Sequence, residues 1–154
     1  MDLGDILTRE RVIACLRAKT KKQVLQDLSE QAAELTGLVG RQIFESLLQR
    51  ERLGSTGLGR GIAIPHVKLA GLDRIQCIFA RLEHPVEFEA PDGEPVDLVF
   101  MLMAPEHASG DHLKALAKIS RLLHEPSALE RLRSARDAAA LFTLLTAAPT
   151  SHAA

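Results

Sequence analysis

Apolar and polar positions along the chain follow two different periods, which separate helical from extended segments. Apolar side chains recur at helical spacing over residues 24–35. Thr20 stands where an N-cap belongs, Gln23 follows three residues later, and Gly37 is placed to end the helix in the left-handed conformation. A second helical pattern covers residues 40–54. The first third of the chain therefore predicts two consecutive amphipathic helices.

The middle of the chain changes to the patterns that are typical of strands. β-Branched and alternating apolar residues favour extended segments, which we place at residues 12–15, 62–64, 74–83 and 85–90. A turn composition follows over residues 91–94. Residues 96–104 are apolar on both faces after Asp97, so we expect this segment to be the central strand of the sheet.

The last third returns to helical spacing. A helix begins at Asp111, with Leu113 predicted on its inward face, and two shorter helices are predicted from Ser127 and Ser134. Helices, then strands, then helices predict an α/β fold: a single-domain sandwich with a mixed β-sheet flanked by helices on both faces. We expect this domain to span residues 1–147. Residues 148–154 contain no large apolar side chain and are expected to form a flexible C-terminal tail.

The amino-acid composition argues against some classes of binding partner for this protein. The chain has 154 residues and is 46% apolar, which is enough for one core. Its 19 basic residues are balanced by 20 acidic ones, so no basic field is available for nucleic acid. The longest apolar stretches are shorter than the roughly 20 residues that a membrane span needs, which argues against membrane insertion. We expect a cytoplasmic protein.

The sequence offers little for a cofactor or a metal. The two cysteines, Cys15 and Cys77, lie in apolar stretches with no zinc or redox spacing, so both are expected to be buried. The stretch "GLGRG" matches neither the dinucleotide fingerprint nor the phosphate-binding P-loop. No histidine pattern supplies three metal ligands. We therefore expect no cofactor and no bound metal.

Two histidines are candidates for chemistry. His66 ends "GSTGLGRGIAIPH", a glycine-rich stretch that begins at Gly54 and would let an anion or a protein surface approach closely. His112 follows Asp111 in the first turn of a predicted helix, where free N–H groups and the helix dipole favour an anion. The alternatives are a strand-end histidine bonded to a carbonyl for His66 and a first-turn residue without special contacts for His112.

Together the two histidines suggest phosphoryl transfer. A neutral imidazole has one unprotonated nitrogen, which can attack phosphorus and form a transferable phosphoramidate. The protein then has to position the group and to meet its negative charge with donors. A second histidine, a helix terminus, a hydroxyl and an arginine could do this.

The same residues resemble a known family. "QRERLGSTGLGRGIAIPHVK" (residues 49–68) is similar to the active-site stretch of the fructose/mannitol type of enzyme IIA in the bacterial phosphoenolpyruvate-dependent phosphotransferase system. Within that family, "PVDLVFMLMAP" and "DHLKALAKISRLL" are most similar to its nitrogen-regulatory branch. The resemblance implies a phosphoryl carrier in which His66 is phosphorylated and His112 contacts the phosphoryl group.

The resemblance also implies further site residues and partners. Arg50 matches an active-site arginine, although by its pattern alone it is an exposed helix charge, and Ser55 and Thr56 are weaker candidates for stabilising the phosphoryl group. Val67 stands where many members have glycine. The implied donor is a histidine-phosphorylated carrier of the HPr type in its nitrogen-branch form. Implied targets are regulated proteins such as sensor kinases or potassium transporters.

Two alternatives stay open. The chain could be a sugar-specific enzyme IIA that passes phosphate to a separate IIB protein. It could also be a non-catalytic binding module that regulates transporters or kinases whether or not it is phosphorylated.

Overall fold

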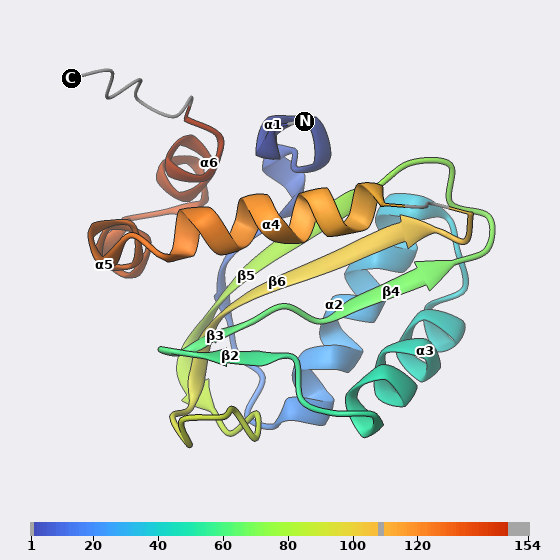
Figure 1. Cartoon of the computed structure of the whole chain (residues 1–154), viewed down its shortest axis with the longest axis horizontal. Helices are drawn as coiled ribbons and strands as arrows, with labels where there is room; N and C mark the ends of the chain where they lie inside the picture. The colour runs from blue at the N-terminus through green and yellow to red at the C-terminus, as the bar shows by residue number, and fades with distance from the viewer. Residues whose placement is uncertain (1, 108–109, 148–154) are drawn as a thin grey trace.

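The computed structural model describes residues 2–107 and 110–147 and places a mixed β-sheet between two layers of helices (Figure 1). The predicted fold class is confirmed. The segment predicted as a flexible tail, 148–154, lies outside the described residues. Within the described ranges no helix combines the length and the apolar composition that crossing a membrane would require.

The sheet has six strands in the order β1-β5-β6-β3-β2, with β4 also paired to β6. Their bounds are β1 (Val12–Leu16), β2 (Gly57–Gly59), β3 (Ile62–Ala63), β4 (His66–Leu69), β5 (Gln76–Val86) and β6 (Val96–Pro105). β5 runs antiparallel to β6, whereas β3 and β4 both run parallel to it. β6 is therefore the central strand, as its apolar sequence predicts.

Two helices cover one face of the sheet. They are α2 (Lys21–Thr36) and α3 (Gly40–Arg52). The predicted start and end of α2 are confirmed, because the Thr20 hydroxyl accepts a hydrogen bond from the Gln23 N–H at 3.1 Å and Gly37 has a φ of 77°. Leu25 and Leu28 of this helix are fully buried in the core on this face.

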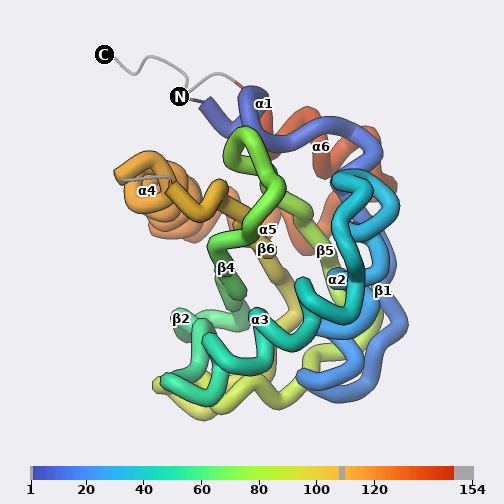
Figure 2. The backbone as a smooth tube through the Cα atoms, turned by 90° about the vertical axis from the view of Figure 1, so that its right-hand side faces the viewer, coloured from blue at the N-terminus to red at the C-terminus, as the bar shows by residue number. Residues whose placement is uncertain are grey.

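The opposite face is covered by helices from both ends of the chain. They are α1 (Leu3–Ile6), α4 (Asp111–Leu123), α5 (Pro126–Ser134) and α6 (Ala138–Thr146), and a 3₁₀ turn, η1 (Arg9–Arg11), follows α1. Phe79 and Phe100 project into this second core and meet edge to face with their ring centroids 4.9 Å apart. In both backbone views β4 lies between α3 and α4 (Figures 1 and 2).

Some predicted strands and helices differ from the structure. The strand expected at 74–83 corresponds to β5, whose register with β6 shifts between Arg81 and Val86. The separate strand expected at 85–90 is wrong, because β5 runs on to Val86 and residues 87–90 form no strand. Neither β2 nor β4 was predicted. α5 begins at Pro126 and not through a Ser127 cap, and α6 is capped by Asp137, whose carboxylate accepts from the Ala140 N–H at 2.9 Å, rather than by Ser134.

Two predicted burials are wrong. Leu113 is 60% exposed, because the inward face of α4 consists of Ala115, Ile119 and Leu123. Cys15 is exposed on β1, while Cys77 is buried as expected. In both cases an apolar neighbourhood in the sequence did not determine which side of the element faces the core.

Candidate functional site

His66 is fixed by the backbone around Pro65. It is the first residue of β4 and pairs with Leu102 of β6, and the Leu102 N–H donates to the Pro65 carbonyl at 2.8 Å. The ring atom Nδ1 lies 2.9 Å from the carbonyl oxygen of Ile64. Because a carbonyl only accepts, Nδ1 carries the hydrogen and Nε2 keeps its lone pair. His66 therefore makes the carbonyl bond expected of a strand-end histidine. The same bond leaves Nε2 unprotonated and able to act as a nucleophile.

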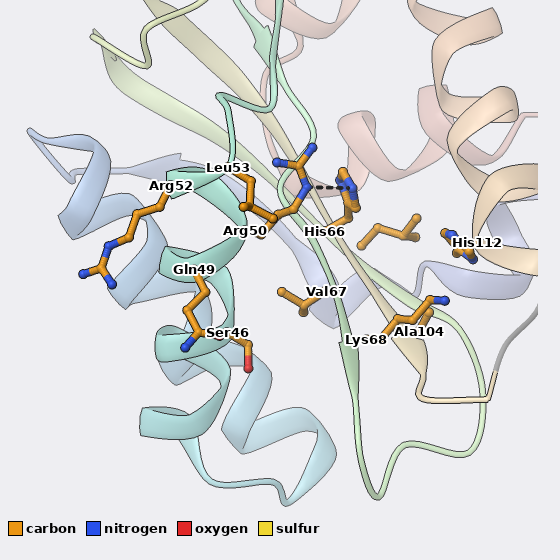
Figure 3. A pocket seen from close by; sticks show the side chains of 11 residues that line it. Ser46, Gln49, Arg50, Arg52, Leu53, His66, Val67, Lys68, Ala104 and His112 are labelled. Atoms are coloured by element: carbon orange, nitrogen blue, oxygen red, sulfur yellow. Dashed lines mark hydrogen bonds between the residues drawn. The ribbon is translucent and has the colours of Figure 1, made fainter.

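Arg50 approaches that free nitrogen from the last turn of α3. Its Nε–H donates to His66 Nε2 at 3.3 Å, and its Nη1 donates to the Gly54 carbonyl at 2.9 Å. The bond to the Gly54 carbonyl holds the guanidinium at the end of its own helix, in a position from which Nε can donate to the His66 ring. Figure 3 shows the Arg50 side chain turned towards His66. Arg50 is therefore more than an exposed helix charge.

His112 lies on the other side of the same pocket. It occupies the first turn of α4, where free backbone N–H groups and the helix dipole favour an anion. Its Nδ1 is buried and has no hydrogen-bond partner among the described residues. His66 lies between Arg50 and His112 in the close view (Figure 3). The structure thus brings the three principal candidates from the sequence to one place.

The pocket has a volume of about 650 Å³, within the range of small-ligand sites. Its lining comes from α3, β4, β6 and α4: Ser46, Gln49, Arg50, Arg52, Leu53, His66, Val67, Lys68, Leu102, Ala104 and His112. None of these residues is acidic, whereas three carry a permanent positive charge. Such a lining favours a small anion with several charged oxygens.

Lys68 is a pocket residue that the sequence analysis missed. It lies two residues after His66 on β4, so both side chains project from the same face of the strand. In Figure 3 it extends along the His112 side of the pocket, whereas Arg52 points away from His66. The alternation along residues 66–69 would have found Lys68, had a strand been predicted there.

Ser55 and Thr56 do not line the pocket. The Ser55 hydroxyl donates to the Phe88 carbonyl and accepts from the Gly57 N–H at 3.0 Å. Thr56 is buried, and its hydroxyl and N–H both donate to the carboxylate of Glu51. Both hydroxyls are therefore used to hold the loop that follows α3.

Two of the glycines before His66, Gly57 and Gly61, lie against neighbouring segments of the protein. A Cβ at Gly57 would lie 2.9 Å from the Cβ of Ala90, and one at Gly61 would lie 2.5 Å from Arg133 Nη2. These distances are too short for a side chain, so the space beside these two glycines is already filled. At Gly57 and Gly61 the atoms that approach the backbone belong to neighbouring segments of the protein, whereas nothing lies within 4 Å of a Cβ at Gly54.

Val67 follows the candidate nucleophile on β4 and lines the pocket. Its side chain is buried and belongs to the core on the α2 and α3 face. Alternation along β4 turns it away from the side that carries His66 and Lys68.

In the described part of the chain, no group of three His, Cys, Asp or Glu side chains is arranged to hold a metal ion.

Comparisons with known proteins give one consistent family. Residues 5–148 match the family described as "Phosphoenolpyruvate-dependent sugar phosphotransferase system, EIIA 2". A "Nitrogen regulatory protein" of Bradyrhizobium diazoefficiens is 50% identical over 99% of this chain and all of the relative, and one of Pseudomonas aeruginosa is 42% identical over 93% of this chain and 94% of the relative. The crystal structure of the nitrogen regulatory protein IIA-Ntr from Neisseria meningitidis superposes with a TM-score of 0.89 at 37% identity, covering 94% of this chain and 99% of the other.

Proposed function

This chain belongs to the type 2 enzyme IIA family of the phosphoenolpyruvate-dependent phosphotransferase system and is a phosphoryl-carrying component of it. We propose that His66 accepts the phosphoryl group on Nε2. The observation that carries the proposal is the pair of contacts at the imidazole. Nδ1 is held by the Ile64 carbonyl, and Nε2 faces the Arg50 guanidinium. A ring held in this way presents its lone pair to the pocket.

The transfer needs no cofactor. The lone pair of His66 Nε2 forms a bond to the phosphorus of a phosphohistidine on the donor, and the P–N bond to the donor breaks, its electron pair returning to the donor imidazole. Positive charge develops on the His66 ring as the new bond forms. The Ile64 carbonyl stabilises this charge by accepting from Nδ1–H.

The other pocket residues stabilise the transferred group. Arg50 Nε donates to Nε2 in the free protein and is placed to donate to phosphoryl oxygens once that nitrogen is occupied. His112 and Lys68 offer further donors from the opposite side. A set of fixed donors around the phosphoryl oxygens is what this reaction requires of a protein.

We propose that the donor is an HPr-like carrier of the nitrogen branch and that the output is regulatory. The two similar proteins described above are both named nitrogen regulatory proteins, which supports this branch over a sugar-specific role. Phosphorylation adds about 1.5 to 2 negative charges to a pocket lined by positive ones. Such a change alters which proteins dock over the pocket, with sensor kinases or potassium transporters as the proposed targets.

Phosphorylation of the purified protein tests the proposal. The protein is incubated with phosphoenolpyruvate, enzyme I and an HPr-type carrier, and its intact mass is recorded under mildly basic conditions. The wild type should gain one phosphoryl group and His66→Ala none. His84→Ala, which removes an exposed histidine of β5 outside the pocket, serves as the matched control and should gain one group. An unmodified wild type would favour the non-catalytic binding module.

A further inference from the structure

The turn between β2 and β3 is held in a conformation that its sequence does not favour. Arg60 has a φ of 56°, in the left-handed region that costs free energy for a residue with a Cβ. Its N–H donates to the Asp92 carboxylate at 2.8 Å, and its carbonyl accepts from Arg133 Nη2 at 2.6 Å. Arg133 is in turn held by two bonds to the Asp97 carboxylate, each of 2.9 Å. The N–H and the carbonyl of Arg60 are therefore both held by hydrogen bonds.

The Arg60 side chain connects this turn to α4. Its Nη2 donates to the carbonyl of Leu123, the last residue of α4, at 2.7 Å. The last carbonyls of a helix have no partner within the helix and carry the negative end of its dipole, so a guanidinium there is favourable on both counts. The contact joins residues that are far apart in the sequence, one from the strands that lead to His66 and one from the helix that begins beside His112.

Among residues 2–107 and 110–147, none gives the other end of α4 a comparable anchor. Its N-cap is Gly110, which has no side chain to cap the helix, and His112 Nδ1 is buried without a partner among the described residues. Along its length α4 packs through Ala115, Ile119 and Leu123, and the Lys118 ammonium donates to the exposed Asp2 carboxylate at 2.9 Å. Apolar contacts have no direction, and an exposed ion pair contributes little. The part-buried bond from Arg60 to Leu123 is therefore an important restraint on sliding of α4 along its axis.

We propose that Arg60 is a positioning residue for phosphoryl transfer: by holding the end of α4 it sets where His112 stands relative to His66. The inference rests on the proposed function of these two histidines. In Figure 1, α4 lies beside β3 and β4. Arg60, in the turn before β3, bonds to the last residue of α4, and His66 of β4 and His112 of α4 line the same pocket. Sliding α4 by a fraction of an ångström would move the His112 donor with it.

The test measures the rate of transfer from an HPr-type carrier as a function of carrier concentration, which separates the limiting rate from KM. Arg60→Gly suits the positive φ and removes the contact with Leu123. It should lower the limiting rate about tenfold and leave KM unchanged, because misplacement of a catalytic group by about 1 Å can cost up to a hundredfold. Arg136→Ala removes an exposed arginine from the segment between α5 and α6 and should match the wild type.

A double variant distinguishes positioning from general loosening of the fold. If Arg60 acts through His112, its removal has no further effect in a His112→Ala background. Equal effects of Arg60→Gly in both backgrounds, or an unchanged limiting rate in the wild-type background, would overturn the proposal. Should Arg60→Gly fail to fold, Arg133→Ala loosens the same turn and should show the same dependence on His112. A wild type that takes up no phosphoryl group would instead contradict the proposed function itself.

Discussion

At the scale of single residues, the chemistry proposed for the pocket depends on the hydrogen-bond partners of individual side-chain atoms. His66 has two ring nitrogens, and a backbone carbonyl takes one of them. Arg50 likewise divides its guanidinium between the Gly54 carbonyl and the His66 ring. The same residue types with other partners would give a solvated histidine and a surface cation. The reactivity proposed for His66 follows from these local bonds.

Replacing Arg50 by alanine tests the contribution of the guanidinium. We expect Arg50→Ala to lower the rate of phosphoryl transfer by about 10²- to 10³-fold, the usual effect of removing one fixed donor to a charged transition state. Single-turnover transfer from the HPr-type carrier measures this rate. Arg41→Ala is the matched control, since Arg41 is an exposed arginine of the same helix that does not line the pocket. Equal rates for both variants would return Arg50 to the role of a surface charge.

The two cysteines should differ in reactivity. Cys77 is fully buried, and burial raises the pKa of its thiol to about 12, so almost no thiolate forms near neutral pH. Cys15 is exposed. A disulfide reagent should therefore modify one thiol in the native protein and two after unfolding. Cys15→Ser should abolish the native reaction, and rapid labelling of two native thiols would contradict the structure.

At the scale of elements, sequence patterns predicted long segments better than short ones. α2 has both a capping residue and a terminating glycine, and β6 is apolar on both faces, so each was identified from the sequence. β4 was not, because its four residues follow a proline and its pairing with β6 comes from the tertiary structure. Missing β4 also meant missing Lys68. His66 and His112 were found because their flanking motifs are local, whereas the Arg60 contact joins distant segments.

A side chain at Gly61, in the turn between β2 and β3, should lower the free energy of unfolding. Gly61→Ala forces a residue with a Cβ to a φ of 80° and places that atom 2.5 Å from Arg133 Nη2. Gly93→Ala is a matched control, with a φ of 73° and open space around it. Backbone strain alone costs about 1 kcal/mol at either position. At Gly61 the Arg133 side chain must also shift out of its bonds to Arg60 and Asp97, so Gly61→Ala should lose about 2 kcal/mol of unfolding free energy and Gly93→Ala about 1. Urea denaturation measures both, and equal losses would contradict the packing described for the turn.

The same turn should make stability sensitive to acid. N–H donors from Arg60 and then Glu94 hold the pKa of Asp92 below its ordinary value of 3.8. The folded state therefore favours the carboxylate, and this stabilisation is present above pH 3.8 and is lost as the pH falls through the lowered pKa. Asp92→Asn should lower the Tm at pH 7, and its difference from the wild type should shrink below pH 3.8. A difference independent of pH would show that the charge is unimportant.

At the scale of the whole molecule, the pocket lies where the two helical layers meet the same strands. α3 belongs to one layer and α4 to the other, and β4 carries His66 between them (Figure 2). The two cores on either side of the sheet thus hold Arg50 and His112 at opposite sides of one imidazole. This arrangement leaves the donors fixed before a partner docks, which is what transfer of a phosphoryl group requires.

The most direct test locates the phosphoryl group on the ring. The protein is labelled with ¹⁵N, phosphorylated through an HPr-type carrier, and its histidine ring nitrogens are assigned by NMR with His66→Ala as the reference. We predict phosphorus bonded to Nε2 of His66, with Nδ1 still protonated and bonded to the Ile64 carbonyl. Phosphorylation at Nδ1, or at His112, would contradict the account.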